Sequence, residues 1–263
     1  EKKNQMNLAE KIRERLMVRN ILLMTHVIVG YPSLEANWSM LRAMTEAGVD
    51  LVELQMPFSE PTADGPLFVR ANQDALKKGT TLKDYFSLMR RVSSECPMKI
   101  LMMGYCNTAF NLGFEEFPSI LAENGASGFI IPDLPIEEYG ELHQKSVEHG
   151  IHPVMLCTPT NTHERLEKIL SHASGFAYCV ARKGVTGKST ELNAETDVFL
   201  SLSRELTDIP IALGFGLSKP ENIRMLQSKV EIAIVGSALL KSWEKGGESA
   251  YREHLFSLAE ARN

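Results

Sequence analysis

Short apolar runs alternate along the chain with longer stretches in which apolar residues recur every three or four positions. The runs are rich in Val, Ile, Leu and Met, as expected for strands of a parallel sheet that is buried on both faces. They predict strands at 21–28, 50–55, 99–103, 127–131, 152–156, 176–180, 210–213 and 231–235. The longer stretches predict helices at 34–47, 67–78, 114–124, 137–149, 162–171, 196–206, 220–227 and 238–245.

This alternation predicts an α/β fold, a (β/α)8 TIM barrel with extra helices at 7–19, 81–94 and 249–261. No stretch has the composition of a linker, so we expect a single domain over 1–263. A length of 263 residues, 44% of them hydrophobic, suits one barrel of this kind. The rival is an open doubly wound sheet, but the first strand-to-helix turn, HVIVGYPS, lacks the GxGxxG fingerprint of that fold.

Charge and cysteine content exclude several classes of protein. The net charge is −5 and the basic residues are scattered, which is unlike a nucleic-acid-binding surface. No apolar run approaches the roughly 18 residues of a membrane helix, and the charged first residues are unlike a signal peptide. The four cysteines are far apart and form no metal-ligand pattern. We therefore expect a cytoplasmic protein with reduced thiols, no metal and a small-molecule ligand.

Two carboxylates belong to the second predicted strand and the loop that follows it. Glu53 lies inside the apolar run DLVELQ, and Asp64 follows in PFSEPTADGP. Because side chains alternate along a strand, Glu53 and Gln55 share one face and are expected to point into the barrel. Burial disfavours an unpaired carboxylate ion, which suits Glu53 to carrying a proton. The alternative is a structural ion pair.

Two glycine-rich segments follow the last two predicted strands. GFGLSKPEN contains Gly216, and GSALLK begins with Gly236 and Ser237. Glycine permits close backbone approach, and free N–H groups at a helix N-terminus attract anions, so the pair predicts a phosphate site. Either segment alone could be an ordinary turn. CVARKGVTGKS, after the sixth strand, predicts a mobile lid or an exposed loop without a catalytic role.

Several motifs occur together, in order, over nearly the whole chain. ELQMPFSEPTADGP, RKGVTG, GFGLS and VGSALLK, with GYCN at 104–107 and PDLP at 132–135, resemble the signatures of the tryptophan synthase alpha chain family. The family's pattern at the first of these is LELG-PFSDP-ADGP. The resemblance implies a lyase of tryptophan biosynthesis that cleaves indole-3-glycerol phosphate to indole and glyceraldehyde 3-phosphate by a retro-aldol reaction.

The resemblance also implies a role for each matching residue. Glu53 matches the general acid/base at C3 of the indole, and Asp64 matches the acid that hydrogen-bonds the indole N–H. Tyr178 matches a tyrosine beside the substrate. The remaining matches are Thr186, for the lid threonine that closes onto the Asp64 loop, and Gly187, Gly216, Gly236 and Ser237, for the phosphate site.

Partners and cofactors follow from the same resemblance. The chain itself is expected to need no cofactor, and pyridoxal phosphate is expected only in a tryptophan synthase beta subunit. In the family, indole passes to that subunit through a tunnel within an α2β2 complex. PDLP and the Asp64 loop would lie at the junction.

The sequence departs from the family pattern at four positions. Gln55 replaces a glycine, Glu60 an aspartate and Thr62 a leucine, while His26 stands where aromatic or aliphatic residues are usual. Gln55 could crowd the indole pocket or hydrogen-bond Glu53, so Gln55 and His26 are possible modulators. For His26, a satisfied barrel histidine is the alternative.

Two other functions remain open at this point. Another phosphosugar barrel enzyme, such as an isomerase or indole-glycerol-phosphate synthase, would usually need a lysine on an early strand, and strands one and two have none inside. A non-catalytic activator of a beta subunit would keep the interface alone.

Overall fold

The sheet closes on itself as a parallel barrel. The computed structural model describes residues 6–181, 194–214 and 216–263. Its strands are β1 (Leu22–Ile28), β2 (Leu51–Gln55), β3 (Lys99–Met103), β4 (Gly128–Ile130), β5 (His152–Pro153), β6 (Met155–Cys157), β7 (Ala177–Val180), β8 (Ile211–Gly214) and β9 (Ile232–Val235). They are hydrogen-bonded in the order β5-β4-β3-β2-β1-β9-β8-β7-β6. The first and last strands are therefore neighbours, and the predicted α/β barrel is confirmed.

The two strands at the ends of that order, β5 and β6, are the two halves of the fifth predicted strand. They are separated only by Val154. β5 pairs with β4 and β6 pairs with β7, so the chain changes partner at Val154. Eight predicted strands thus appear as nine segments of one barrel.

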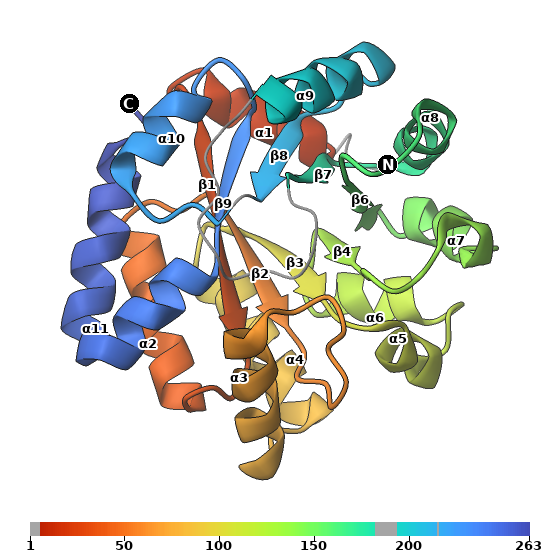
Figure 1. Ribbon diagram of the computed structural model, residues 1–263. Helices are drawn as coiled ribbons and strands as arrows, with labels where there is room; N and C mark the ends of the chain where they lie inside the picture. Colours follow the sequence, from red (N-terminus) through yellow and green to blue (C-terminus); the bar gives the residue numbers. More distant parts are fainter. Residues whose placement is uncertain (1–5, 182–193, 215) are drawn as a thin grey trace.

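Helices surround the sheet, with α2 and α11 on one flank and α3 beneath the ends of β1 and β2 in the view of Figure 1. They are α1 (Leu8–Leu16), α2 (Leu34–Glu46), α3 (Pro66–Lys77), α4 (Leu82–Glu95), α5 (Cys106–Leu112), α6 (Phe117–Glu123), the 3₁₀ turn η1 (Ile136–Glu138), α7 (Leu142–Glu148), α8 (His163–His172), α9 (Ala194–Leu206), α10 (Pro220–Leu226) and α11 (Ser237–Glu260). Local capping starts several of them. Asn7 caps α1, Ser33 caps α2 and Thr81 caps α4 through their side-chain oxygens.

The helical prediction was wrong in two places. α5 was not predicted, because it is short and buries only Ala109, so it shows no apolar period. The predicted helix 137–149 is η1 followed by α7. The two helices predicted at 238–245 and 249–261 are confirmed as the two parts of α11, which are separated by a kink with non-helical backbone at Gly246 and Gly247.

The barrel interior and the layer between sheet and helices form separate cores. Inward-facing residues such as Leu22, Met24, Leu51 and Leu101 pack with one another and with Leu8 of α1. α1 therefore covers the end of the barrel at which the strands begin. The other strand face packs against the helices, as alternation requires.

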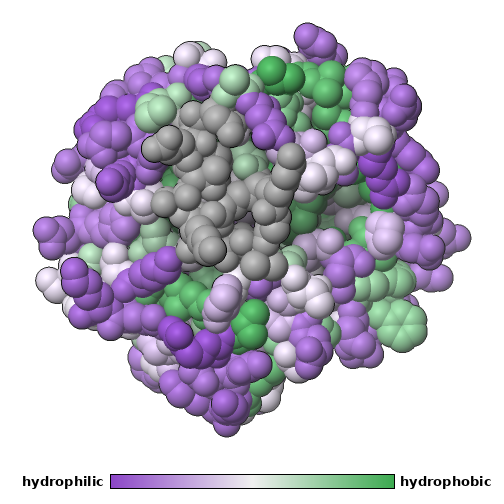
Figure 2. Space-filling view, in the orientation of Figure 1, coloured by the Kyte–Doolittle hydropathy of each residue, from purple (hydrophilic) through white to green (hydrophobic). Residues whose placement is uncertain are grey.

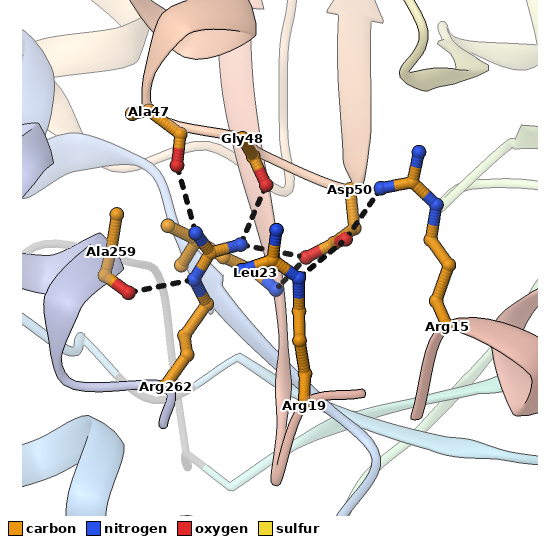
Figure 3. A network of polar contacts seen from close by, with 8 residues as sticks. All are labelled: Arg15, Arg19, Leu23, Ala47, Gly48, Asp50, Ala259 and Arg262. Atoms are coloured by element: carbon orange, nitrogen blue, oxygen red, sulfur yellow. Dashed lines mark hydrogen bonds and ion pairs between the residues drawn. The ribbon is translucent and has the colours of Figure 1, made fainter. Parts of the chain in front are cut away.

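Asp50, which precedes β2, anchors a buried ionic network at the same end of the barrel (Figure 3). Arg262 donates to Asp50 Oδ2 at 2.9 Å and to the carbonyl oxygens of Ala47 and Gly48. Arg15 donates to Asp50 Oδ1 at 2.7 Å. The network joins the last turn of the chain to β2 and to the helix that covers the barrel.

The outer surface is predominantly hydrophilic in the view of Figure 2, with scattered hydrophobic residues. None of the helices in the described ranges combines the length and hydrophobicity that a bilayer crossing requires. All four cysteines are free thiols, and Cys157 and Cys179 are buried.

Candidate active site

Glu53 and Gln55 point into the barrel, as predicted from their spacing. In the strand register, His26 on β1 lies beside Glu53, and Ile28 lies beside Gln55. The side chains of His26 and Glu53 are 7% and 4% exposed, and Gln55 is fully buried. The prediction that Glu53 and Gln55 share the inward face of β2 is therefore confirmed. His26 on β1 faces the interior beside them.

A chain of short hydrogen bonds links the two carboxylates. His26 Nδ1 lies 2.8 Å from Glu53 Oε2, and His26 Nε2 lies 2.7 Å from Gln55 Oε1. Gln55 Nε2 in turn donates to Asp64 Oδ2 at 2.7 Å. The predicted contact of Gln55 with Glu53 is thus indirect, because His26 lies between them. Glu53 has the ion-pair partner that the structural alternative required, but only on one of its oxygens.

The other oxygen, Glu53 Oε1, is buried and has no hydrogen-bond partner among the described residues. A buried carboxylate oxygen without a partner is costly in a structural role. An oxygen of this kind is expected where a bound ligand supplies the missing hydrogen-bond donor.

Asp64 is 8% exposed and is held from two elements. Gln55 and Asn72, which lies on α3, both donate to its Oδ2. Burial raises the pKa of the Asp64 carboxyl and the charge of Glu53 acts in the same direction, while hydrogen bonds from Gln55 and Tyr105 and the charge of His26 oppose them. Because burial dominates, a proton is easier to place on Asp64 than on an exposed aspartate.

The pKa of His26 is shifted upward from the ordinary histidine value. Burial lowers it, but the hydrogen bond and charge of Glu53, the charge of Asp64 and the hydrogen bond of Gln55 together outweigh burial. The imidazolium form is therefore stabilised by Glu53, which contacts the ring, and by the nearby charge of Asp64.

Tyr178 lies on β7 and faces the same interior. Burial raises the pKa of its hydroxyl well above 10, and the charge of Glu53, an interaction with the Glu53 carboxyl of hydrogen-bond type and the charge of Asp64 raise it further. The distance from Tyr178 to Glu53 exceeds that of an ordinary hydrogen bond, because Glu53 Oε1 has no partner within that range among the described residues. A side chain at Gly214 would come within 2.9 Å of the Tyr178 ring, so glycine at that position leaves room for the tyrosine. The structure thus brings Tyr178 together with the two carboxylates.

The predicted phosphate residues follow two adjacent strands. Gly214 of β8 pairs with Ile234 of β9, so the segments that begin at Gly216 and Gly236 leave the barrel side by side. Gly216 is exposed and has a positive φ of 66°, which favours glycine. Gly236 caps α11 without a side-chain hydrogen bond, and Ser237 is the first helical residue. Among the described residues no side chain caps the N-terminus of α11, and an uncapped helix N-terminus is an arrangement that suits an anion.

Two predicted site residues, Thr186 and Gly187, lie outside the described residues, as does Gly184 of the same segment.

Three residues at the site were not predicted from the sequence. The hydroxyl of Tyr105 accepts a hydrogen bond from the backbone of Ala63, beside Asp64. Asn72 accepts from the backbone of Phe58 as well as donating to Asp64. Phe68 stacks on His26 with ring centroids 4.7 Å apart. GYCN marked Tyr105 as part of a motif, but the contacts of Asn72 and Phe68 depend on how α3 packs and leave no local signal.

The closed barrel, with linked acids at its interior and an uncapped helix N-terminus after its last strand, defines an acid/base enzyme of the (β/α)8-barrel class that suits an anionic ligand. No group of three His, Cys, Asp or Glu side chains within the described part of the chain could hold a metal ion. Residues 14–261 match the sequence profile of the tryptophan synthase alpha chain family, and the chain belongs to that family.

Relatives and solved structures agree with this assignment. The tryptophan synthase alpha chain of Syntrophotalea carbinolica is 41% identical over 94% of this chain and 98% of its own length. That of Methanosarcina acetivorans is 37% identical over 96% and 91%. A Mycobacterium tuberculosis tryptophan synthase structure superposes with a TM-score of 0.91 at 27% identity, covering 98% and 99% of the two chains. The resemblance stated from the motifs, the barrel and the lyase class of tryptophan biosynthesis are confirmed.

A solved Aquifex aeolicus protein adds a second structural match, with a TM-score of 0.90, 32% identity and coverage of 98% and 100%. A tryptophan synthase complex from Pyrococcus furiosus matches with a TM-score of 0.82 and 27% identity over 91% of this chain and 98% of that one. The family relationship implies a beta-subunit partner for this chain.

Proposed function

We propose that Glu53 and Asp64 carry out the lyase reaction of this chain on indole-3-glycerol phosphate. The observation that carries the proposal is Glu53 Oε1, which is buried and has no donor within hydrogen-bonding distance among the described residues. The hydroxyl of Tyr178 is a nearby protein group that interacts with the Glu53 carboxyl, and this interaction raises the pKa of that hydroxyl. A carboxyl group in that environment can give a proton to a substrate carbon and take one back.

The reaction divides between the two acids. Glu53 protonates C3 of the indole, which turns the ring into an electron sink. Asp64 accepts a hydrogen bond from the indole N–H and stabilises the positive charge that spreads to nitrogen. Loss of the proton of the glycerol hydroxyl then breaks the carbon–carbon bond, and the electron pair of that bond returns to the ring. The products are indole and glyceraldehyde 3-phosphate, and no step needs a cofactor in this chain.

The phosphate of the substrate would bind at Gly216, Gly236 and Ser237, where two loops and the N-terminus of α11 meet. Tyr178 would lie against the indole ring. We also propose, on the motif resemblance alone, that Thr186 belongs to a lid and that Gly187 contacts the phosphate.

The assembly is proposed on the same grounds. The chain would act in the cytoplasm as one domain, within an α2β2 complex whose beta subunit holds pyridoxal phosphate. Pairing of β1 with both β2 and β9 supports the single domain, because it joins the first and last strands in one barrel.

The test is turnover of indole-3-glycerol phosphate by the purified chain, with and without a beta subunit, for the wild type and for Glu53→Gln. The amide has the shape of the acid but cannot carry its proton, so we expect cleavage to fall by about 10²- to 10⁴-fold with an unchanged circular dichroism spectrum. Wild-type turnover in the variant would remove Glu53 from the mechanism.

The same assay decides between the enzyme and a non-catalytic activator. The activator is considered because Gln55 and His26, which depart from the family pattern, contact the two acids directly. An activator would raise the rate of the beta subunit while the wild type and Glu53→Gln cleave equally little.

A further inference from the structure

The orientation of the hydrogen-bond network at the barrel interior is fixed by backbone groups. Asn72 Oδ1 accepts from the N–H of Phe58 at 3.0 Å, and Asn72 Nδ2 donates to the carbonyl of Phe68 at 2.8 Å. A backbone N–H can only donate and a carbonyl can only accept, so these two contacts settle which end of the Asn72 amide is which.

Asn72 then orients Gln55. Gln55 Nε2 lies 2.7 Å from Asp64 Oδ2 and 3.4 Å from Asn72 Oδ1, which are both acceptors. The nitrogen of the Gln55 amide must therefore face Asp64 and Asn72. Its oxygen must face His26 Nε2, which lies 2.7 Å away.

Gln55 in turn orients His26. Because Gln55 Oε1 is an acceptor, His26 Nε2 must carry a proton. The other ring nitrogen, Nδ1, lies 2.8 Å from Glu53 Oε2. Without a proton between them, the lone pair of Nδ1 would repel the lone pairs of the carboxylate oxygen. A second proton must therefore lie between Nδ1 and Oε2.

We propose that His26 is a positioning residue: it rests as an imidazolium between Glu53 and Gln55, and it holds the proton on which the action of Glu53 depends. Gln55 extends this link to Asp64, so the two acids respond to pH as one unit rather than separately. The proposal rests on the proposed function only where it concerns the rate of cleavage.

The surroundings of His26 contain few other charges. Among the described residues, the titratable groups around the ring are Glu53 on β2 and Asp64 in the following loop, with the hydroxyls of Tyr105 and Tyr178 facing those acids. α3 contributes the stacked ring of Phe68, which carries no charge. The raised pKa of His26 agrees with two acids and no competing cation at the ring.

His152 provides an internal contrast. Its Nε2 accepts a hydrogen bond from the N–H of Leu8, so that nitrogen carries no proton. Its Nδ1 contacts Ser174 Oγ, and burial together with the charge of Lys11 lowers the pKa of the ring. On this proposal the barrel holds two histidines with opposite protonation, His26 at the end with the acids and the partly buried His152 at the end that α1 covers.

The first experiment measures protons directly and needs no substrate. Long-range ¹H–¹⁵N spectra of the labelled full chain, recorded from about pH 6 to about pH 9 across the ordinary histidine range, should show both nitrogens of His26 protonated at neutral pH. His152 should show one protonated nitrogen. In Glu53→Gln, His26 should lose a proton at lower pH than in the wild type. A His26 ring with one protonated nitrogen at neutral pH would overturn the proposal.

The second experiment uses His26→Phe, which keeps an aromatic ring against Phe68 but removes both hydrogen bonds. We expect the pH–rate profile of cleavage to shift by about one unit and kcat at neutral pH to fall about tenfold, with KM little changed because the phosphate contacts remain. A profile that overlays the wild type would overturn the kinetic part. If the wild type does not cleave the substrate at all, the proposed function fails, and the spectra still decide the protonation of His26.

Discussion

Gln55 occupies the space between the two acids, where the family pattern has glycine. It is fully buried and hydrogen-bonded at both ends of its amide, to His26 and to Asp64. The polar side chain therefore does not stand alone in an apolar pocket. Together with His26, it links two acids that would otherwise be separated.

Replacing Gln55 with glycine should change the pH dependence of cleavage more than it changes phosphate binding. The variant loses a hydrogen bond that lowers the pKa of Asp64 and one that raises the pKa of His26. Asp64 would then stay protonated to higher pH, so the acid side of the pH–rate profile should move to higher pH. Binding of glycerol phosphate, measured by calorimetry, should stay within about threefold of the wild type, or about 0.7 kcal/mol, because the proposed phosphate loops follow other strands.

Packing is the rival account of Gln55. Under it, the glycine variant leaves a cavity, lowers the melting temperature and keeps the wild-type pH–rate profile. Such a pair of results would assign Gln55 to packing alone.

At the scale of elements, the ends of β8 and β9 bring Gly216 and Gly236 together at the start of α11. A side chain at Gly236 would come within 3.2 Å of Phe68 and 3.5 Å of His26. Gly216 has a φ of 66°, which strains any other residue. Both positions therefore favour glycine, which is the residue that would let the backbone approach the phosphate at the proposed site.

Gly216→Val and Gly236→Val should each weaken binding of glycerol phosphate by about tenfold or more, the loss of roughly one charge-assisted hydrogen bond. Gly150→Val is the matched control for Gly216, because Gly150 also has a φ of 66° but would meet nothing within 4 Å. Affinity can be measured by titration calorimetry. Equal affinity in both variants and the wild type would show that the phosphate binds elsewhere on the protein.

The elements that sequence periodicity predicts are those that bury a continuous apolar stripe. β2 and its inward residues Glu53 and Gln55 were predicted because alternation along a strand decides which side chains share a face. α5 was missed because a helix of seven residues with one buried side chain has no period to detect. The placement of Asn72 against Asp64 could not be predicted either, since it depends on the angle at which α3 packs on the barrel.

At the scale of the whole molecule, the end of the barrel opposite the acids is held together by Asp50. Both oxygens of this fully buried carboxylate are engaged, and its partners come from the start and the end of the sequence (Figure 3). The backbone of Leu23 also donates to Asp50, so β1 is included. The network stabilises the barrel where α1 covers it.

Arg262→Ala should lower the free energy of unfolding by about 3 kcal/mol, the usual cost of removing one partner of a buried ion pair. The variant leaves Asp50 with Arg15 and Arg19 as its cationic partners and the N–H of Leu23 as a donor. It also leaves the carbonyls of Ala47 and Gly48 without the Arg262 donor. Urea unfolding followed by circular dichroism measures the difference.

Arg224→Ala is the control for this change, because Arg224 forms an exposed ion pair with Glu221 and should contribute little. Equal midpoints for the two variants would show that the buried network adds nothing beyond a surface pair.

The contact between Arg262 and Asp50 spans 212 positions of the sequence. During synthesis on the ribosome, β1, β2 and β3 can leave the exit tunnel and begin to pair while the guanidinium that Asp50 will bind has not yet been made. A nascent chain of this protein therefore carries Asp50 through the synthesis of 212 further residues, the last of which is Arg262. β9, the strand that pairs with β1 to close the barrel, is made only shortly before Arg262. Closure of the barrel should accordingly follow the emergence of β9, and the buried network should form only after Arg262 has emerged.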